Sequence, residues 1–236
     1  MESETDPNDM KSGGFHRACR WDFDSSGRQD LIAGTDKGLL YLLIEERPLG
    51  TGGACKYKSV GPLKDSEGKV IKVHNRACAG GMDLNGDGRE DLVVGGVSYQ
   101  KGIESDPNPG GGFYYLLNTG LDQDRLPVLT PMRPLPVQGH EFDFYVNSHV
   151  QIQAGVFDFM DVGTKQLVLA AQRDHFQGRI FEPCGHGGNI GVRYTGVMLP
   201  RLSIDDRLLD IDGDGKLEFV FGGGEQGEAY HQKISR

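Results

Sequence analysis

Residues 82–96 read MDLNGDGREDLVVGG, and this stretch decides the fold. Its first part alternates side chains that carry oxygen atoms with other residues, as a loop that surrounds a hard cation does: Asp83, Asn85, Asp87 and Asp91. Its second part is a short apolar run containing β-branched residues, which is typical of a buried strand. The stretch therefore predicts an acidic turn that leads directly into a β-strand.

The same pattern recurs three more times along the chain. Residues 21–34 read WDFDSSGRQDLIAG, residues 157–171 read FDFMDVGTKQLVLAA, and residues 209–223 read LDIDGDGKLEFVFGG. We call residues 22–30, 83–91, 158–166 and 210–218 the first to fourth loops, and we number each from its leading Asp as position 1. After each loop and its strand comes a Gly followed three residues later by an aromatic residue, which we interpret as the next strand: Gly38 and Tyr41, Gly112 and Tyr115, Gly178 and Phe181, Gly227 and Tyr230. Self-similarity of this kind is the signature of a repeat architecture.

The repeats predict an all-β fold. The chain has 36 Gly and 11 Pro among 236 residues, and helical periodicity is not sustained anywhere. The distance between leading aspartates fits a four-stranded β-propeller blade, because four short strands with their turns need about 50 to 75 residues. We therefore expect a single β-propeller domain over residues 1–236, with four blades at about residues 14–72, 73–147, 148–199 and 200–236.

Three of the four loops carry the oxygen atoms that Ca²⁺ prefers, so we expect about three calcium sites. The predicted ligands are the side chains at positions 1, 3, 5 and 9 and the main-chain carbonyl at position 7. They are Asp22, Asp24, Ser26, Arg28 and Asp30 in the first loop, Asp83, Asn85, Asp87, Arg89 and Asp91 in the second, and Asp210, Asp212, Asp214, Lys216 and Glu218 in the fourth.

Two features limit this calcium prediction. An EF-hand needs a bidentate Glu at position 12, where this chain has Ala33, Val94 and Phe221, so that class of site is excluded. In the third loop Met160 and Val162 stand where ligands are needed, and we expect this loop to keep the turn without the metal. The alternative, that the loops are solvated acidic turns, stays open because Asp and Gly are common in turns.

The loop motif D-x-[DN]-x-[DS]-G-x-x-[DE] followed by [LF]-[IV]-x-G resembles the FG-GAP/VCBS repeat family, which includes the propellers of integrin α subunits. The resemblance covers the chain from about Trp21 to about Tyr230. It implies a module that binds carbohydrate or protein, in an extracellular or periplasmic setting. Integrin-like propellers carry seven blades, so four repeats imply either a small closed propeller or part of a larger one.

The same family includes polysaccharide lyases, and this gives an alternative function. His74 and His149 each precede a leading Asp by nine residues, so both would lie at the start of an innermost strand. With Tyr145 and Arg76 they would form a set for β-elimination on an acidic polysaccharide, where His acts as acid or base and Arg neutralises a carboxylate. A His at a strand start also commonly just bonds a neighbouring backbone group, and the sequence leaves both interpretations open.

Charge and hydropathy exclude two classes of partner. The formal net charge of −9 argues against nucleic-acid binding, which needs a basic surface. No run of about 18 apolar residues is present, so we expect no membrane span. The first residues lack the basic and apolar regions of a signal peptide, which predicts either an intracellular protein or a piece of a longer exported chain.

Overall fold

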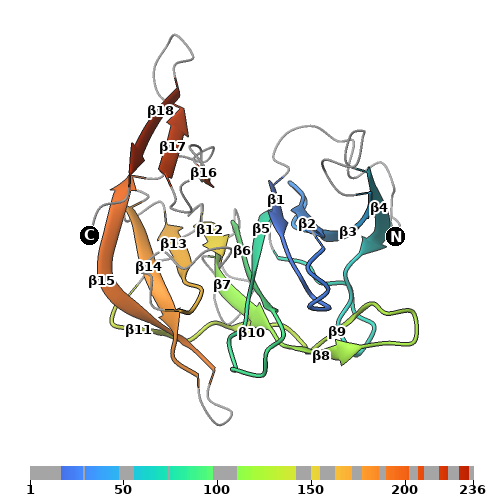
Figure 1. The fold of residues 1–236 in the computed structure, drawn as a ribbon. Helices are drawn as coiled ribbons and strands as arrows, with labels where there is room; N and C mark the ends of the chain where they lie inside the picture. Colours follow the sequence, from blue (N-terminus) through green and yellow to red (C-terminus); the bar gives the residue numbers. More distant parts are fainter. Residues whose placement is uncertain are drawn as a thin grey trace.

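The computed structural model describes residues 17–28, 30–47, 56–73, 75–97, 111–141, 150–154, 163–171, 177–185, 190–201, 207–209, 218–222 and 229–233 (Figure 1). All the regular structure in these ranges is β-strand, which confirms the all-β prediction. Within the same ranges no helix is long and apolar enough to cross a membrane.

Of the eighteen described strands, sixteen form four sheets that follow one another along the chain, and the other two form a separate two-stranded hairpin. The first contains β1 (Arg17–Arg20), β2 (Leu31–Gly34), β3 (Leu40–Arg47) and β4 (Lys56–Pro62), in that order. The second contains β5 (Asn75–Met82), β6 (Asp91–Val97), β7 (Gly111–Leu116) and β10 (Arg133–Pro134). The third contains β12 (Val150–Ala154), β13 (Leu167–Ala171), β14 (Gln177–Pro183), β15 (Val192–Arg201) and β11 (Val137–Gln138). The fourth contains β16 (Arg207–Leu209), β17 (Glu218–Gly222) and β18 (Ala229–Lys233).

Each loop joins the first two strands of one sheet. The strand predicted after each loop is present as β2, β6, β13 and β17, and each pairs antiparallel with the strand before the loop. Figure 1 shows β1, β5 and β12 in the middle of the molecule, with β4 and β15 at its outer sides. In agreement with this view, β5 contacts both β1 and β12.

Successive sheets pack through opposite faces of their strands, because side chains alternate along a strand. In the second sheet Leu92 and Val94, at positions 10 and 12, join a core shared with the first sheet, whereas Val93 joins a core shared with the third. The first and third sheets follow the same rule. Ile32, at position 11, faces the second sheet, and Leu167 and Leu169, at positions 10 and 12, face it from the third. The second sheet is therefore buried on both faces.

The strand predicted from each Gly and aromatic pair is present, as β3, β7, β14 and β18, but the aromatic residues do not share one register. Tyr41 pairs with Ala33, at position 12, but Tyr115 pairs with Val93, at position 11. Tyr114, which pairs with Val94, is therefore the structural counterpart of Tyr41. Equal spacing between a Gly and an aromatic residue does not fix register, because the turns between the strands differ in length and the faces alternate with every residue.

The second and third sheets are connected by a segment that contributes strands of its own. The hairpin of β8 (Asn118–Leu121) and β9 (Pro127–Leu129) follows β7, and β10 then returns to the edge of the second sheet. The next strand, β11, pairs in parallel with β15 at the far edge of the third sheet. The chain thus supplies an edge strand to the third sheet before it enters the first strand of that sheet.

Close backbone approach between the first two sheets gives a test of this packing. A Cβ added at Gly34 would lie 1.9 Å from the carbonyl oxygen of Ala77, so the two sheets would have to move apart. We expect Gly34→Ala to lower the free energy of unfolding by about 3 kcal/mol, at the upper end of overpacking effects. Chemical denaturation measures this value.

Gly68→Ala is the matched control. Gly68 has φ of 80° and open space around it, so Ala there incurs only the backbone penalty of about 1 kcal/mol. Equal losses for the two variants would contradict the close approach of the first two sheets.

Candidate functional site

The first loop is closed by hydrogen bonds from its own backbone to its leading carboxylate. The amides of Ser26 and Gly27 donate to the two oxygens of Asp22, at 2.9 and 3.1 Å. Gly27, at position 6, has φ of 79°, a left-handed conformation that favours Gly. The amide of Ser26 also donates to Asp24 at 3.2 Å. The side chains at positions 1 and 3 are thus held by the loop that carries them.

The second loop has the same construction. The amides of Gly86 and Gly88 donate to Asp83 at 2.8 and 2.9 Å, and the amide of Asp87 donates to Asn85 at 2.9 Å. Gly88, at position 6, has φ of 86° and matches Gly27. The equivalence of the two loops therefore extends from their sequence to their hydrogen bonds.

The side chain at position 9 is fully buried in each of the three loops where it is described: Asp30, Asp91 and Gln166. Asp30 accepts the amide of Glu45 at 2.8 Å, and Asp91 accepts the amide of Asn118 at 2.8 Å. The other oxygen of Asp91 accepts the amide of Leu84, whereas Oδ2 of Asp30 is buried without a hydrogen-bond partner. Asp30 thus fixes the first loop to β3, and Asp91 fixes the second loop to the start of β8.

Burial has a strong effect on the acidity of these two residues. The pKa of Asp91 is raised to about 6, chiefly by burial and in part by the nearby charges of Asp87 and Asp83, against the lowering effect of two backbone hydrogen bonds. The pKa of Asp30 is also raised, chiefly by burial and in part by Asp24 and Asp22. Both carboxylates are therefore destabilised in their charged form unless a cation lies near.

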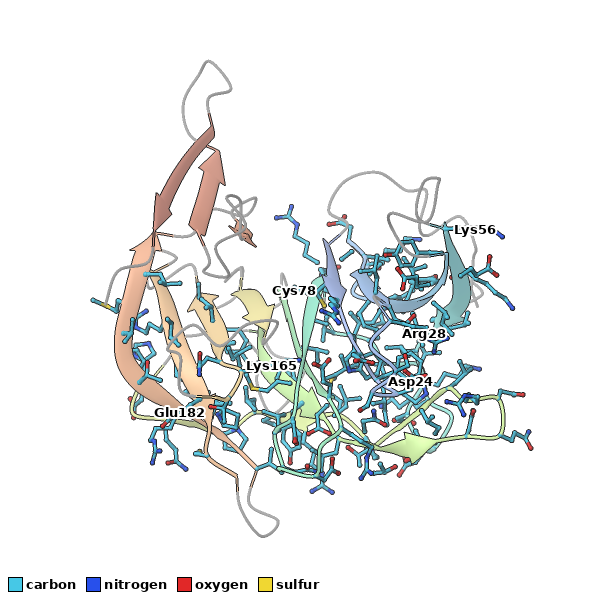
Figure 2. The ribbon with its side chains drawn as sticks, viewed as in Figure 1. Asp24, Arg28, Lys56, Cys78, Lys165 and Glu182 are labelled. Carbon is cyan, nitrogen blue, oxygen red and sulfur yellow. The ribbon has the colours of Figure 1, made fainter. Side chains whose placement is uncertain are left out.

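In the first loop the arginine at position 7 supplies part of that positive charge. The guanidinium of Arg28 lies 2.7 Å from Asp24 and 3.7 Å from Oδ2 of Asp30 (Figure 2). Burial would raise the pKa of Asp24, but the hydrogen bonds from Ser26 and the charge of Arg28 lower it overall. In the second loop Arg89 lies 2.6 Å from Asp87 and also donates to the carbonyl of Asn118. Each guanidinium thus acts as an internal counter-ion.

The described end of the third loop keeps the turn. Gly163, at position 6, has φ of 81°, as its counterparts in the first two loops do. Gln166 donates to the carbonyl of Thr164, so an uncharged amide occupies the buried place that a carboxylate takes elsewhere. The prediction that this loop retains its turn is confirmed at Gly163, while Met160 and Val162 lie outside the described residues.

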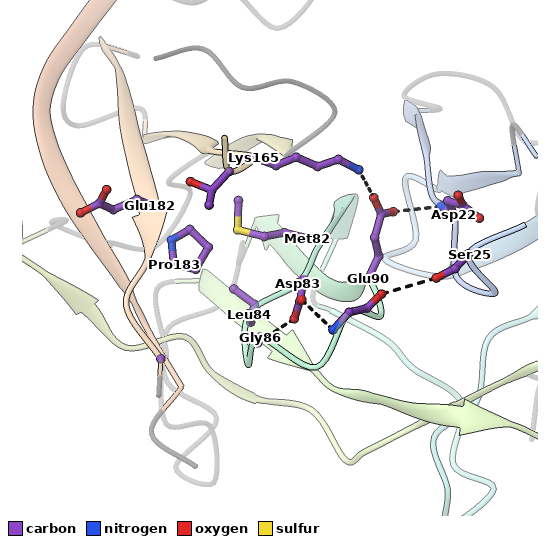
Figure 3. Close-up of a pocket in the computed structure, with 13 residues that line it drawn as sticks. Asp22, Ser25, Met82, Asp83, Leu84, Gly86, Glu90, Lys165, Glu182 and Pro183 are labelled. Carbon is purple, nitrogen blue, oxygen red and sulfur yellow. Dashed lines mark hydrogen bonds and ion pairs between the residues drawn. The ribbon is translucent and has the colours of Figure 1, made fainter. Parts of the chain in front are cut away.

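A pocket of about 460 Å³ opens where the first three loops meet the end of β14 (Figure 3). Met82, Leu84 and Pro183 give it apolar walls. Its charged and polar lining comes from Asp22, Ser25, Asp83, Glu90, Thr164, Lys165 and Glu182. Its volume lies in the range of about 300 to 1,000 Å³ that is typical of ligand sites.

The structure places the predicted site residues as follows. Asp22 and Asp83 line the pocket, whereas Asp24, Asp30, Asp87 and Asp91 hold the loops behind it. Arg76 lies at the start of β5, has φ of 50°, and its Nε lies 3.4 Å from Asp36. The remaining predictions lie outside the residues, or the side chains, that the structure describes: His74, Tyr145, His149, Asp210, Asp212, Asp214, Lys216 and Glu218.

Sequence reasoning missed Glu182 on β14, which lines the pocket, and two charged loop residues of the lining, Glu90 and Lys165. Both stand at position 8, which the loop motif leaves unspecified, and the corresponding residue of the first loop is Gln29. Their side chains form an ion pair between the second and third loops. No repeat pattern could have revealed them, because the residue type differs in every copy.

Within the described part of the chain, no group of three or more His, Cys, Asp or Glu side chains converges as a metal site would. The oxygen atoms of the first two loops are turned toward loop amides and arginines instead. No protein-family model, curated protein or solved structure matches the chain. The resemblance to FG-GAP repeats therefore rests on the loop residues, and the calcium sites stay a prediction.

The raised pKa of Asp91 predicts how stability depends on pH in metal-free buffer. The folded state holds the proton up to about pH 6, whereas the unfolded state releases it near the ordinary value of 3.8. Stability therefore falls as the pH rises through this window, by about 2 to 3 kcal/mol for a shift of this size. Asp91→Asn should remove most of this slope in denaturant titrations between pH 4 and 7. A slope that is the same in both proteins would contradict the assignment.

Proposed function

We propose that the chain is a calcium-stabilised β-propeller of the FG-GAP kind whose loop-bearing face binds a carbohydrate or a protein. The observation that carries this proposal is the equivalence of the first two loops, which share hydrogen bonds, a left-handed Gly at position 6 and a buried Asp at position 9. These loops surround the pocket described above.

The packing of the sheets supports a propeller. Four mainly antiparallel sheets follow in chain order, each loop joins the first two strands of its sheet, and β5 lies between β1 and β12. The regular use of positions 10 to 12 to face the preceding and the following sheet is what radial repetition requires. In this proposal the four blades form either a small closed propeller or part of a larger ring, the two alternatives that the resemblance implies.

The described donor set fits calcium in the first two loops. Asp22, Asp24, Ser26 and Asp30 with the carbonyl of Arg28 would hold one ion, and the matching residues of the second loop would hold another. Oδ2 of Asp30 supports this fit, because it is buried without a hydrogen bond and has only the guanidinium of Arg28 at 3.7 Å, and a buried carboxylate oxygen without a hydrogen bond is costly. A bound Ca²⁺ would supply the positive charge that Arg28 and Arg89 now provide in part.

Thermal melts test the metal. At a calcium concentration 100 times the dissociation constant, one site adds about 2.7 kcal/mol, which raises the melting temperature of a chain of this size by about 5 to 10 °C. Melts with calcium and with a chelator measure this difference. Asp83→Asn should reduce it, because one position-1 ligand loses its charge.

Asp65→Asn provides the matched control for Asp83→Asn. Asp65 also accepts two backbone amides in a turn, from Glu67 and Lys69, but it lies outside the four loops. This variant should keep the full calcium effect. A melting temperature that calcium does not change in the unmodified protein would overturn the metal part of the proposal.

Binding is favoured over catalysis because the described pocket has apolar walls and polar groups but no His or Cys among its lining residues. The residues of the lyase alternative include Arg76, which lies at the opposite end of β5 from the loop and pairs with Asp36. The pocket thus offers contacts for a ligand on the loop-bearing face.

Glycan and peptide arrays test the binding function, and affinities for the strongest binder locate it. Thr164→Tyr places a bulky ring on an exposed residue of the lining and should weaken binding at least about tenfold, as the loss of a well-placed contact does. Thr119→Tyr, at an exposed residue of β8 outside the lining, should leave the affinity unchanged. Equal affinities for both variants would place the ligand elsewhere.

An activity assay on the same protein preparation distinguishes the lyase from the binding module. Acidic polysaccharides incubated with the protein should give no absorbance of unsaturated uronate products. Absorbance that His74→Ala and His149→Ala abolish would replace the binding function with the lyase.

A further inference from the structure

Three loops from three different sheets are joined by one chain of polar contacts. Lys165 of the third loop forms an ion pair with Oε1 of Glu90 in the second loop. The other oxygen of Glu90, Oε2, accepts the backbone amide of Asp22 at 2.9 Å, at the start of the first loop. Figure 3 shows the side chain of Lys165 extending across the pocket toward Glu90.

The carboxylate of Glu90 lies in a place built for it. A Cβ added at Gly81 would stand 2.6 Å from Oε2 of Glu90 and 2.5 Å from Cδ1 of Trp21, so only Gly leaves room for both side chains. Trp21 also donates from its indole nitrogen to the carbonyl of Glu90 at 3.1 Å. The side chain of Glu90 is 16% exposed. The backbone and the carboxylate of Glu90 are thus fixed on the side of the first sheet.

The third loop differs from the first two in the sign of the charge that it contributes. Its position 9 is the uncharged Gln166, and its position 8 is Lys165. The first two loops surround carboxylates that need an outside cation or an arginine, whereas the third loop sends a cation into its neighbour. A tethered ammonium requires no ligands of its own, which suits a loop that has Met and Val at positions 3 and 5.

We propose that Lys165 is a positioning residue of the pocket. Its ammonium holds the carboxylate of Glu90, and through Glu90 it holds the amide of Asp22 and therefore the start of the first loop. Without Lys165 the carboxylate is drawn toward water and the hydrogen bond to Asp22 weakens. These contacts are made without metal or ligand, although Asp22 is a proposed calcium ligand and all three residues line the pocket, so the test is made in the absence of both.

Hydrogen exchange at the Asp22 amide tests this role, because the effect appears in a sheet to which Lys165 does not belong. In the presence of a chelator, Lys165→Met should speed exchange at this amide about three- to fivefold, the size of an effect from one partly exposed ion pair. Lys165→Arg should restore most of the protection, since a guanidinium also pairs with a carboxylate. Molar salt should speed exchange in the unmodified protein and leave Lys165→Met unchanged.

Two further variants make the test specific. In a Glu90→Gln background, Lys165→Met should add nothing, because its effect passes through the carboxylate. Lys56→Met removes a matched ion pair, to Glu46, in which both side chains are more exposed, and should leave the Asp22 amide unchanged. Lys165 is about half exposed, so the variant is expected to fold, and Lys165→Gln replaces it if the melt shows otherwise.

Unchanged exchange at Asp22 in Lys165→Met, or an equal increase with and without the Glu90 carboxylate, would overturn the positioning role. Because the measurement is made with chelator and without ligand, that result would leave the calcium melts and the arrays to decide the proposed function separately.

Discussion

A buried carboxylate at the end of a tight loop is the constraint on which the rest of this structure depends. Asp30 and Asp91 are fully buried, and an ionised group there is tolerated only with hydrogen bonds and positive charge nearby. The amides of Glu45 and Asn118 meet the first need, and Arg28, which lies 3.7 Å from Oδ2 of Asp30, meets part of the second at Asp30. Asp30 thereby fixes the first loop and β2 to β3, and Asp91 fixes the second loop and β6 to the start of β8.

That arrangement explains why the sheets stack regularly. Once position 9 is fixed, the alternation of side chains sends positions 10 and 12 to one face and position 11 to the other. Leu92 and Val94 then meet the first sheet while Val93 meets the third. A further contact joins β8 to the first loop: the uncharged side chain of Asn118 donates a hydrogen bond to the carbonyl of Phe23 at 2.8 Å. The loop chemistry and the core packing are therefore two results of the same register.

Much of this was predictable from the sequence, and the limits have physical causes. The loop motif and the apolar run after it predicted the turns, the β-strands and the position-6 glycines, because these are local properties of the chain. The register of Tyr115 was not predictable from its spacing to Gly112, because turn length decides it. Glu90 and Lys165 were missed because their role depends on which loops become neighbours in space. The sequence shows which side chains carry oxygen atoms that a cation could bind. Whether those oxygen atoms point to one place depends on the fold.

The strand β11 has a consequence for how this chain can be divided. It precedes β12 in sequence by more than ten residues, yet it forms the far edge of the third sheet through parallel pairing with β15. A cut between the second and third sequence repeats would separate β11 from β15, the strand with which it pairs. The second repeat therefore supplies an edge strand to the third sheet. A single repeat excised at its sequence boundary would expose unpaired backbone that the intact chain covers.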